Sequence, residues 1–482
     1  MAKQKKEFVE HITSQSEDFS RWYTDVVKNA ELMDYSDVKG CMVIKPYGYG
    51  IWELIQNELD ARFKATGHKN AYFPLLIPES LLMKEAEHVE GFAPEVAWVT
   101  HGGGEKLAER LAIRPTSETI ICSMYSKWIQ SYRDLPMLLN QWCSVLRWEK
   151  TTRPFLRSSE FLWQEGHTVH ETQAQAEEET LRMIGVYREF SENVLAIPVI
   201  VGQKSQKEKF AGADHTYTME GMMPDGRALQ MGTSHNLGQN FAKGYDIKYL
   251  SREGKQEYAW QTSWGVSTRL IGGLIMVHGD DRGLKLPPKV APTQCMVIPV
   301  AAHKPGVTEK AQELTAALKA AGIRTEIDER EQSVGWKFNE CEMRGISVRI
   351  ELGPKDLEQG HVVAVRRDTL EKIVLPWEGL EDAIKQLLED IHANMFEMAK
   401  KYRDEKIYEA SNFDEFVKNV EEGQGFVRAP WCDETACELE IKEKTGITTR
   451  CMPLFEDFDV TGRTCVHCGK PAKKIMYFGK SY

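Results

Sequence analysis

The chain has 482 residues, enough for two to four domains, and its 42% hydrophobic and 28% charged content is typical of an ordinary soluble protein. The net charge of −11 argues against a general nucleic-acid binder, so contact with nucleic acid requires local basic patches. No apolar run approaches the roughly 18 residues that span a bilayer, and the N-terminus lacks an apolar signal-peptide core. These features predict a cytoplasmic protein without membrane contact.

The first 286 residues predict one α/β (α+β) unit. An opening helix over about 5–30 and a second helix from Tyr49 to Lys64 precede a strand over 70–78 that is closed by prolines. Strands and helices then alternate irregularly, with antiparallel-type patterns at 141–168, 214–220 and 227–233.

The segment 147–167 predicts two strands joined by a short loop, with Arg147 and Glu149 on one face of the first strand. Period-2 alternation places four side chains on one face of the second strand: Phe161, Trp163, Glu165 and His167. An amphipathic hairpin with a solvated charged face is the ordinary alternative. Aromatic rings among the charges instead favour a pocket for a flat, anionic and amine-bearing ligand.

The segment 263–273 predicts a strand that turns into an apolar helix, with Arg269 in the helix's first turn. Free N–H groups at a helix N-terminus favour an anion, as does the guanidinium. The glycine-rich loops of P-loop and dinucleotide-binding proteins are absent. ATP, if it binds, would therefore lie on an antiparallel sheet and be held by arginines and stacking.

The segment 286–292, with three prolines, is the clearest linker. Beyond it the pattern becomes βαβ, with strands at 295–300, 323–329, 347–353 and 361–367 and helices between them. A helix over about 379–403 leads to the C-terminal end. The predicted domains are therefore 1–286, 287–400 and 401–482.

Five of the ten cysteines lie near the C-terminus, and two close pairs among them fit a tetrahedral zinc site: Cys432, Cys437, Cys465 and Cys468. Cys451 is the spare cysteine, and His467 is the other possible ligand. Four protein ligands would close the site, so we expect structural zinc. Lys470, Lys473 and Lys474 nearby form either a basic patch or a solvated tail.

These residues resemble the three motifs of class II aminoacyl-tRNA synthetases. The helix and strand around Pro74 resemble motif 1, 147–163 resembles motif 2, and the Arg269 segment resembles motif 3. The run Arg157-x-x-Glu-Phe-Leu-Trp-Gln-Glu-Gly-His resembles the prolyl-tRNA synthetase family in particular, and the similarity extends over nearly the whole chain. It implies an antiparallel-sheet catalytic domain, a mixed α/β anticodon-binding domain and a small C-terminal zinc-binding domain of the archaeal and eukaryotic type.

The resemblance implies two catalytic arginines, Arg147 on the α-phosphate and substrate carboxylate, and Arg269. It implies a set of ATP-binding residues: Arg147, Glu149, Arg157, Ser158, Phe161, Gln230, Thr233, Ser267 and Arg269. Arg157 would face the distal phosphates, Phe161 would stack on adenine, and Glu149 would contact its edge. Mg²⁺ is expected to bridge the phosphates.

The resemblance also implies a proline-binding set: Thr116, Glu118, Arg147, Trp163, Glu165, His167, Phe210 and His235. Glu118 and Thr116 would hold the secondary amine, and Trp163 and Phe210 would supply apolar walls for the ring. The alternative for Glu118 is a helix-capping segment, Thr-Ser-Glu-Thr.

The family also implies a homodimer and tRNA(Pro) as partner, with anticodon contacts expected from Glu340, Arg344, Lys355 and Asp356. In this family a terminal tyrosine, here Tyr482, can bring its carboxylate toward the active site. Only about 95 residues separate His167 from Ser263, which leaves no room for an editing insertion. We therefore expect some misactivation of alanine and cysteine and a separate trans-editing deacylase.

The expected activity is the ATP-dependent attachment of proline to tRNA in two steps, through prolyl-adenylate. One alternative is another class IIa synthetase such as the threonyl enzyme, which holds a hydroxyl with an active-site zinc. A second alternative is a non-catalytic synthetase-like tRNA-binding protein, which usually lacks a motif arginine.

Overall fold

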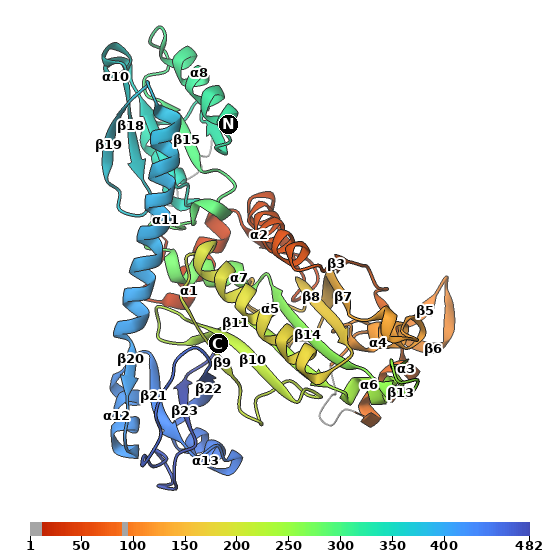
Figure 1. Cartoon of the computed structure of the whole chain (residues 1–482). Coiled ribbons are helices and arrows are strands. Elements are labelled where there is room, and N and C mark those ends of the chain that lie inside the picture. The colour runs from red at the N-terminus through yellow and green to blue at the C-terminus, as the bar shows by residue number, and fades with distance from the viewer. Residues whose placement is uncertain (1–11, 89–94) are drawn as a thin grey trace.

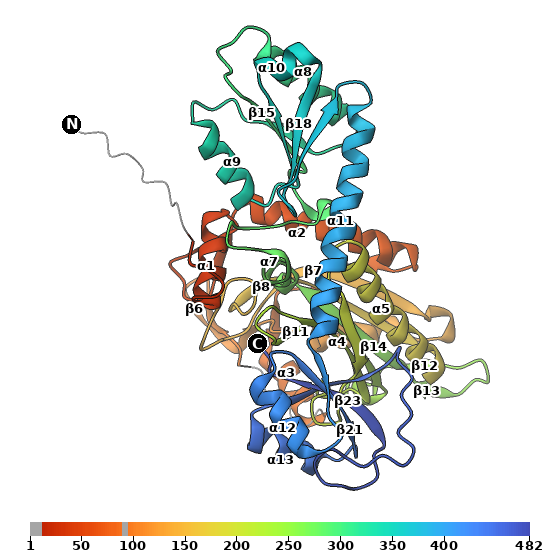
Figure 2. The ribbon, with the colours of Figure 1, turned by 90° about the vertical axis from the view of Figure 1, so that its left-hand side faces the viewer.

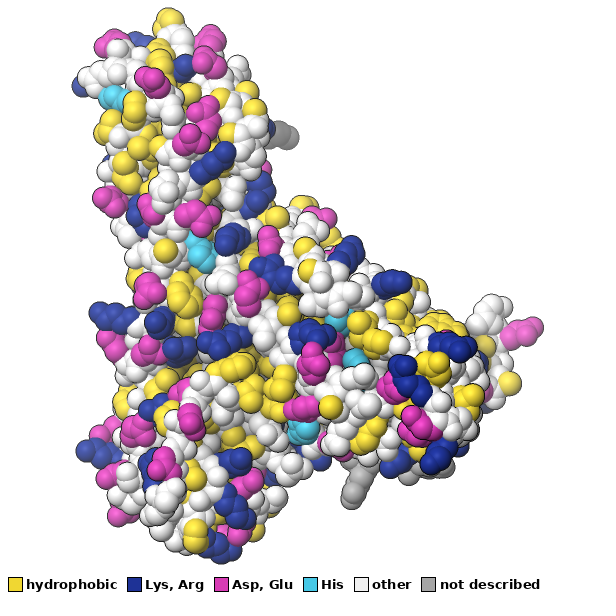
Figure 3. Space-filling view, in the orientation of Figure 1, with side chains coloured by type: hydrophobic (Ala, Val, Ile, Leu, Met, Phe, Trp, Pro, Cys, Tyr) yellow, Lys and Arg dark blue, Asp and Glu magenta, His cyan; other side chains and the backbone are white. Residues whose placement is uncertain are grey.

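The computed structural model describes residues 12–88 and 95–482. Figure 1 shows a central lobe built around a long sheet, an upper lobe, and a lower lobe that ends the chain. Helix α11 (Leu380–Glu405) connects the upper lobe to the lower one and passes along the central lobe (Figure 2). Acidic and basic side chains are interspersed over the face in Figure 3, so this face has no field of a single sign.

An eleven-stranded sheet runs through the central and lower lobes in the order β20-β21-β23-β22-β9-β10-β11-β14-β8-β7-β3. Its central-lobe strands are β3 (Lys69–Asn70), β7 (Met137–Leu146), β8 (Glu160–His170), β9 (Val199–Gln203), β10 (His215–Met222), β11 (Ala228–Gly238) and β14 (Trp260–Ser267). The strands from β9 to β7 pair in antiparallel fashion, which confirms the predicted antiparallel core.

Helix α5 (Gln173–Asn193) covers one face of this sheet, and alternate side chains of each strand point to opposite faces. On the α5 face the hydroxyl of Tyr187 donates to Gln164 Oε1 at 2.6 Å and its ring packs against Trp264. The neighbouring positions Trp163 and Gly265 line a pocket on the other face. The sheet therefore separates the apolar core from a surface that a ligand can reach.

Shorter elements complete the central lobe: α1 (Phe19–Asn29), β1 (Met33–Tyr35), β2 (Met42–Ile44), α2 (Pro46–Ala65), β4 (Leu76–Pro78), α3 (Glu79–His88), β5 (Trp98–Gly102), β6 (Glu105–Ile113), α4 (Glu118–Trp128), α6 (Asn240–Tyr245), β12 (Lys248–Leu250), β13 (Gln256–Tyr258) and α7 (Arg269–His278). The predicted opening helix begins only at Phe19, where the Asp18 side chain accepts from the N–H of Arg21 and caps it. The part of that prediction before residue 12 lies outside the described residues. The strand predicted over 70–78 is two short strands, because Pro74 has no N–H for a ladder.

The upper lobe contains a five-stranded sheet in the order β16-β15-β17-β18-β19, parallel in its first three strands and antiparallel beyond. Its elements are β15 (Cys295–Pro299), α8 (Val307–Ala320), β16 (Thr325–Ile327), α9 (Val334–Met343), β17 (Val348–Leu352), α10 (Pro354–Gln359), β18 (His361–Arg366) and β19 (Lys372–Pro376). The predicted βαβ pattern is confirmed, and β19 and α10 add to it.

The segment predicted as a linker, 286–292, is packed into the structure between the central and upper lobes. It contains a 3₁₀ turn, Pro288–Val290, and both Val290 and Ala291 are fully buried. Arg324 of the upper lobe donates to the carbonyls of Pro288 and Ala291 at 2.7 and 2.8 Å. Buried apolar surface and satisfied carbonyls thus fix the two lobes to each other here.

The lower lobe consists of β20 (Ile407–Glu409), α12 (Phe413–Glu422), β21 (Phe426–Trp431), α13 (Thr435–Thr445), β22 (Thr448–Pro453) and β23 (Lys474–Gly479). Its strand β22 pairs with β9 of the central lobe, in the register Met452 to Gln203 and Pro453 to Gly202. The sheet of the central lobe and that of the lower lobe are therefore one continuous structure.

Candidate active site

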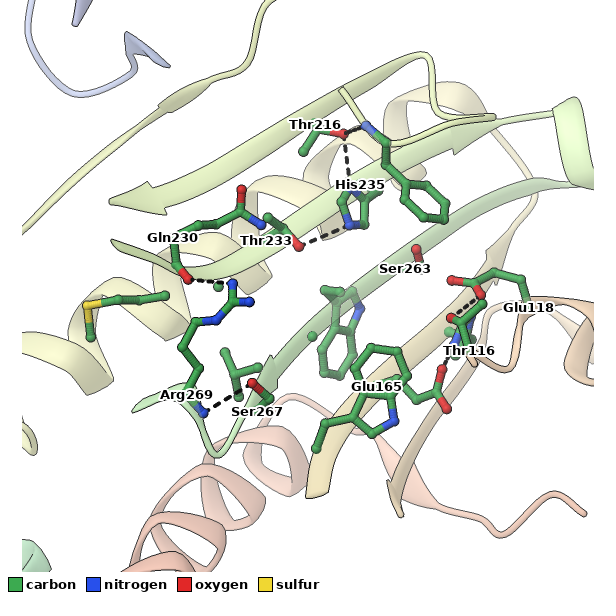
Figure 4. A pocket seen from close by; sticks show the side chains of 18 of the residues that line it. Thr116, Glu118, Glu165, Thr216, Gln230, Thr233, His235, Ser263, Ser267 and Arg269 are labelled. Atoms are coloured by element: carbon green, nitrogen blue, oxygen red, sulfur yellow. Dashed lines mark hydrogen bonds and ion pairs between the residues drawn. The ribbon is translucent and has the colours of Figure 1, made fainter. Parts of the chain in front are cut away.

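A pocket of about 340 Å³ lies on the sheet face opposite α5, over the neighbouring strands β8, β11 and β14 (Figure 4). Most of the predicted substrate-binding residues line it together: Thr116, Glu118, Arg147, Phe161, Trp163, Glu165, His167, Phe210, Gln230, Thr233, His235, Ser267 and Arg269. Segments far apart in the sequence thus converge on one cavity.

The hairpin that begins this site differs in one respect from the prediction. β7 ends at Leu146 and β8 begins at Glu160, so Arg147 and Glu149 lie in a longer connection and not on a strand face. The N–H of Arg147 donates to the carbonyl of Ser159 at 2.8 Å, which joins the two ends of that connection. The four side chains predicted to share a face of β8 all line the pocket.

Arg147 is held by contacts that leave most of its donors available. Its Nε donates to the carbonyl of Pro115 at 3.0 Å, and its guanidinium lies 5.4 and 5.5 Å from the ring centroids of Phe161 and Trp163. Burial lowers the pKa of Arg147, against the opposing effect of nearby carboxylates such as Glu118. A guanidinium that lines a cavity without a bound carboxylate favours an anionic ligand.

Arg269 is the first residue of α7, as predicted for the helix N-terminus. Its Nε donates to the carbonyl of Leu156 at 3.2 Å and its Nη1 to the carbonyl of Gln230 at 3.3 Å. Burial lowers the pKa of Arg269, and the positive charges of Arg147 and Arg157 lower it further. The arginines therefore form a cationic end of the pocket that an anion would stabilise.

The other predicted ATP-binding residues lie around this cationic end. Arg157 is half-exposed, stands 3.8 Å from Glu149, and lines a second cavity next to the pocket. Ser158 is buried in the same connection. Neither Glu149 nor Ser158 belongs to the described lining of the pocket.

The opposite end of the pocket is acidic. Glu118 begins α4 and accepts a hydrogen bond from the Thr116 hydroxyl. Burial raises the pKa of the Glu118 carboxyl, and the nearby His167 offsets only part of this effect. The capping alternative does not hold, because Ser117 occupies the N-cap position without a side-chain cap. A buried carboxylate in a cavity favours a cationic ligand such as an amine.

Glu165 and His167 support this acidic end from β8. His167 Nε2 lies 2.9 Å from Glu165 Oε2, and Gln141 and Ser117 donate to Glu165 Oε1. Burial is the largest effect and opposes the charge on both groups, but their mutual hydrogen bond and attraction, with the other hydrogen bonds and nearby charge, together outweigh it; the pKa of Glu165 is therefore lowered and that of His167 raised. The two side chains form a buried ion pair behind the pocket.

Aromatic rings form the walls between the two ends. Trp163 meets Phe161 edge to face, with ring centroids 6.0 Å apart, and Phe210 lies 4.7 Å from the His235 ring. Burial lowers the pKa of His235 to about 3, so its imidazole is neutral, and Thr216 and Thr233 hydroxyls bond its two nitrogens at 2.9 and 3.0 Å. The walls are apolar and rigid.

Sequence reasoning missed nine residues of the lining, among them four with charged or hydroxyl side chains: Lys204, Glu208, Thr216 and Ser263. Lys204 and Glu208 belong to a charged stretch after β9 that looks like a solvated loop. Thr216 and Ser263 are pocket-facing positions on β10 and β14. Strand alternation could have indicated these two once the sheet order was known.

The four residues expected to contact the anticodon lie in two places of the upper lobe. Glu340 pairs with Arg330 at 2.5 Å near the end of α9, and Arg344 packs 4.2 Å from the Tyr47 ring of the central lobe. Lys355 and Asp356 lie in α10, where Asp356 accepts from the N–H of Gly353 and caps the helix. Figure 2 shows α10 at the far end of this lobe and α9 closer to α2.

The four C-terminal cysteines come together as predicted. The sulfur atoms of Cys432, Cys437, Cys465 and Cys468 lie within 4.8 Å of one another, and none forms a disulfide. Four zinc-bound thiolates would be about 3.8 Å apart, given Zn–S bonds of about 2.3 Å. Cys451 is buried elsewhere, in a cluster with Ile200 and Tyr477. The donor set fits a closed structural zinc site.

A central antiparallel sheet, an arginine just after one strand, a second arginine opening a helix, and one pocket with a cationic and an acidic end together define the catalytic core of a class II aminoacyl-tRNA synthetase. The sequence also matches the class II tRNA synthetase core domain (G, H, P, S and T) over residues 98–278 and an anticodon binding domain over 294–387. The prolyl-tRNA synthetase C-terminal domain matches residues 413–482.

Similar proteins agree with this class. The proline–tRNA ligase of Alkaliphilus oremlandii is 62% identical over 483 residues, which cover 100% of both chains, and proline–tRNA ligase 2 of Bacillus cereus is 59% identical, covering 99% of this chain and 100% of the relative. The structure of prolyl-tRNA synthetase from Cryptosporidium parvum complexed with halofuginone and AMPPNP has a TM-score of 0.94 and 42% identity, covering 98% of this chain and 99% of that one.

The chain therefore belongs to the prolyl-tRNA synthetase family, as its sequence motifs predicted. It is an aminoacyl-tRNA synthetase that joins proline to tRNA and uses ATP as a substrate. This finding favours the proline enzyme over the threonyl and non-catalytic alternatives.

Proposed function

We propose that the pocket binds proline at its acidic end and ATP at its cationic end. The observation that carries this proposal is the separation of unpaired opposite charges within one cavity. Among the described residues Glu118 forms no ion pair, and neither does Arg147 or Arg269. A substrate with a cationic amine, a carboxylate and a neighbouring triphosphate satisfies all three groups.

At the acidic end, Glu118 and Thr116 hold the secondary amine of proline. Trp163 and Phe210 enclose the ring. Glu165 and His167 position this end from behind, and neutral His235 adds a polar surface without a charge that would repel the amine. Arg147 lies between the two ends, so it can bind the proline carboxylate and the α-phosphate together.

At the cationic end, Arg269 binds phosphate, Arg157 faces the distal phosphates, and Phe161 stacks on adenine. Glu149, Ser158, Gln230, Thr233 and Ser267 complete the ATP contacts. Glu208, the third carboxylate of the lining beside Glu118 and Glu165, offers the oxygen ligands that Mg²⁺ prefers, and the ion bound there would neutralise phosphate charge.

The reaction needs no protein nucleophile. A proline carboxylate oxygen attacks the α-phosphorus, the bond to the bridging oxygen breaks, and pyrophosphate leaves with the electron pair. A ribose hydroxyl of the terminal tRNA nucleotide then attacks the prolyl carbonyl, AMP leaves, and the hydroxyl proton goes to solvent. The arginines position the reactants and stabilise the negative charge that develops.

Amino-acid-dependent ATP–pyrophosphate exchange, measured for each of the twenty amino acids without tRNA, tests this proposal. Proline should lead, with weaker signals from alanine and cysteine. Arg269→Gln should reduce exchange by about 100-fold or more, because a transition-state charge contact is lost. Exchange led by another amino acid would overturn the assignment of the acidic end.

We assign one role to each of the predicted domains, 1–286, 287–400 and 401–482. The first unit catalyses, and the second reads the anticodon of tRNA(Pro) with residues that include Glu340, Arg344, Lys355 and Asp356. The third binds structural zinc through Cys432, Cys437, Cys465 and Cys468. Unstacked anticodon bases are recognised by stacking on aromatic side chains and by hydrogen bonds to polar ones. The upper lobe has side chains of both kinds.

We further propose that the enzyme is a homodimer. Large apolar side chains are exposed in and just before the segment that resembles motif 1: Tyr35 at 63% and Val43 at 52% precede it, and Tyr72 at 72% lies within it. Such exposure is typical of an interface. Light scattering should give twice the chain mass. Tyr72→Asp should shift the mass toward the monomer, whereas Val374→Asp, an equally exposed site on the upper lobe, should not.

The absence of an editing insertion indicates that mischarged alanyl-tRNA(Pro) leaves the enzyme intact, so a separate deacylase would clear it. A proline pocket discriminates against alanine by only about 1–3 kcal/mol per methylene. Purified enzyme should form alanyl-tRNA(Pro) and fail to hydrolyse it; rapid hydrolysis would contradict this.

Among the described helices none is both long and apolar enough to cross a membrane. We propose the cytoplasm as the site of action.

A further inference from the structure

A second cavity, of about 580 Å³, opens beside the active-site pocket and shares Lys204, Gln230 and Arg269 with it. The connection over residues 151–157 and the start of β11 form part of its wall. The C-terminal domain forms another part, through Arg450 and the final residue Tyr482. The C-terminal domain therefore contributes side chains to a cavity that is continuous with the active site.

The lining of this cavity is strongly basic. Its six cationic side chains are Arg153, Arg157, Lys204, Arg227, Arg269 and Arg450. Glu208 is the one acidic side chain in this described lining, and the chain-terminal carboxylate of Tyr482 adds at most a second negative charge. Such an excess of positive charge within a cavity attracts polyanions.

Three buried charged side chains, Lys204, Arg450 and Glu220, lie together beside this cavity. Their excess of positive charge is unfavourable when no anionic ligand is bound. Lys204 Nζ lies 3.3 Å from Glu220 Oε1, and Arg450 Nη1 lies 3.8 Å from Glu220 Oε2. The three side chains are 5%, 7% and 0% exposed. Two buried cations thus share one carboxylate, and neither forms another ion pair among the described residues.

Some buried polar atoms beside the cavity lack hydrogen-bond partners. Within residues 12–88 and 95–482, Nε and Nη2 of Arg153 are buried donors without a partner, whereas Glu220 Oε2 is an unpaired acceptor and does not itself favour an anion. The Arg450 guanidinium donates through Nε, to the carbonyl of Thr449 at 2.9 Å. Buried polar groups normally have partners, so unpaired donors around a basic cavity point to an anionic ligand.

We infer that this cavity is a phosphate-binding subsite in which Lys204 and Arg450 bind phosphate oxygens and Glu220 positions them. The inference rests on the proposed assignment of Arg269 to the phosphates of ATP, because that residue joins the two cavities. Two sources of phosphate can reach the subsite: the pyrophosphate portion of ATP, and the phosphodiesters at the 3′ end of the tRNA.

The test uses the full-length enzyme and the variants Arg450→Gln, Arg450→Lys and Lys204→Met. In ATP–pyrophosphate exchange, the KM for pyrophosphate should rise about tenfold or more in Arg450→Gln and Lys204→Met, with the KM for proline unchanged. Arg450→Lys should restore part of the affinity. An unchanged KM for pyrophosphate with an equal rise in the KM for tRNA(Pro), measured in transfer from preformed prolyl-adenylate, would assign the subsite to tRNA phosphodiesters.

Thermal melting distinguishes a role in phosphate binding from a purely structural role. Removal of one of two cations on a shared carboxylate should leave the melting temperature of the ligand-free Arg450→Gln enzyme unchanged or higher, while stabilisation by added pyrophosphate or tRNA(Pro) is lost. Arg428→Gln, an outer arginine of the same domain paired with Glu409, is the control and should keep both affinities.

Two results would overturn the inference. One is an unchanged affinity for both phosphate ligands. The other is a lower melting temperature with a parallel rise of all KM values, including that for proline, and no rescue by lysine. If Arg269→Gln also left exchange intact, the proposed function itself would fail, whereas a loss of exchange in Arg269→Gln alone would reject the subsite and keep the function.

Discussion

Single residues set the difference in charge between the two ends of the active-site pocket. Glu118 stands at one end without an ion-pair partner, Arg269 stands at the other, and Arg147 lies between them; the two arginines donate to carbonyl groups. Glu118 is buried and all three side chains line the same cavity, so a ligand there interacts strongly with their charges. Substitutions that remove one charge should therefore affect one substrate and spare the other.

Glu118→Gln should lower kcat/KM for proline by about 10- to 100-fold, because the amide keeps the shape but loses the charge-assisted hydrogen bond to the amine. The KM for ATP should change little. Steady-state pyrophosphate exchange with each substrate varied in turn measures both. Glu105→Gln, on the exposed edge of β6, is the control and should behave as the wild type. Equal losses for proline and ATP would argue against the amine contact.

The pair of Glu165 and His167 should make stability depend on pH in two directions. The pKa of Glu165 is lowered from 4.5, so its contribution is complete above pH 4.5 and is lost as pH falls through the lower folded value. The pKa of His167 is raised from 6.5, so its contribution is complete below pH 6.5 and is lost as pH rises through the higher folded value.

His167→Gln should therefore cost most, about 3 kcal/mol, between pH 4.5 and 6.5, and its cost should shrink on both sides of this window. Melting temperatures of wild type and variant from pH 3 to 9 measure the difference. His303→Gln, at an exposed position, provides the control. A cost that is independent of pH would show that the imidazole acts by packing alone.

Residue roles on strands and helix ends could be predicted because they depend on local geometry. Period-2 alternation is sufficient to place Trp163 and Glu165 on one face, and a strand-to-helix turn is sufficient to place Arg269 at a helix N-terminus. Lys204 and Arg450 could not be predicted in this way. Their position depends on the pairing of β9 with β22, a contact between distant segments that local patterns do not encode.

At the scale of elements, the junction of β9 and β22 depends on a glycine. A Cβ at Gly202 would lie 2.2 Å from the carbonyl oxygen of Met452 and 2.8 Å from the Cβ of Cys451. The two strands approach so closely that only glycine fits. Any larger residue must push β22 away from the catalytic sheet.

Gly202→Ala should destabilise the enzyme by about 1–3 kcal/mol and increase hydrogen exchange in β22 and β23. Calorimetry and hydrogen–deuterium exchange by mass spectrometry measure the two effects. Gly185→Ala in α5, where an added Cβ meets nothing within 4 Å, should instead be neutral or stabilising. Unchanged exchange in β22 would mean that the junction tolerates the methyl group.

Prolines account for two segments whose structure was predicted only in part from the sequence. Pro74 divides the strand predicted over 70–78 into β3 and β4, because a ladder needs the N–H that proline lacks. The prolines at 287, 288 and 292 suggested a linker, yet Val290 and Ala291 pack in the core. Composition indicates where a chain leaves regular structure but not whether that segment is buried.

At the scale of the whole molecule, the four cysteines proposed to bind zinc lie in a domain whose strands continue the catalytic sheet. Removal of zinc should therefore reduce both stability and adenylate formation. Metal analysis should find one zinc ion per chain in the wild type and in Cys451→Ser, and none in Cys437→Ser. Cys437→Ser should melt at a lower temperature and lose exchange activity; full activity without zinc would contradict the coupling.

The same pairing of β22 with β9 also affects how the protein is made. β9 and its neighbours are translated long before β22, so until the C-terminus emerges β9 presents a row of unpaired N–H and C=O groups. An open strand edge is a template for pairing between molecules, and chains that stop short of β22 would keep that edge and aggregate. β22, which is translated late, thus covers the open edge of β9 and should reduce self-association of the nascent enzyme.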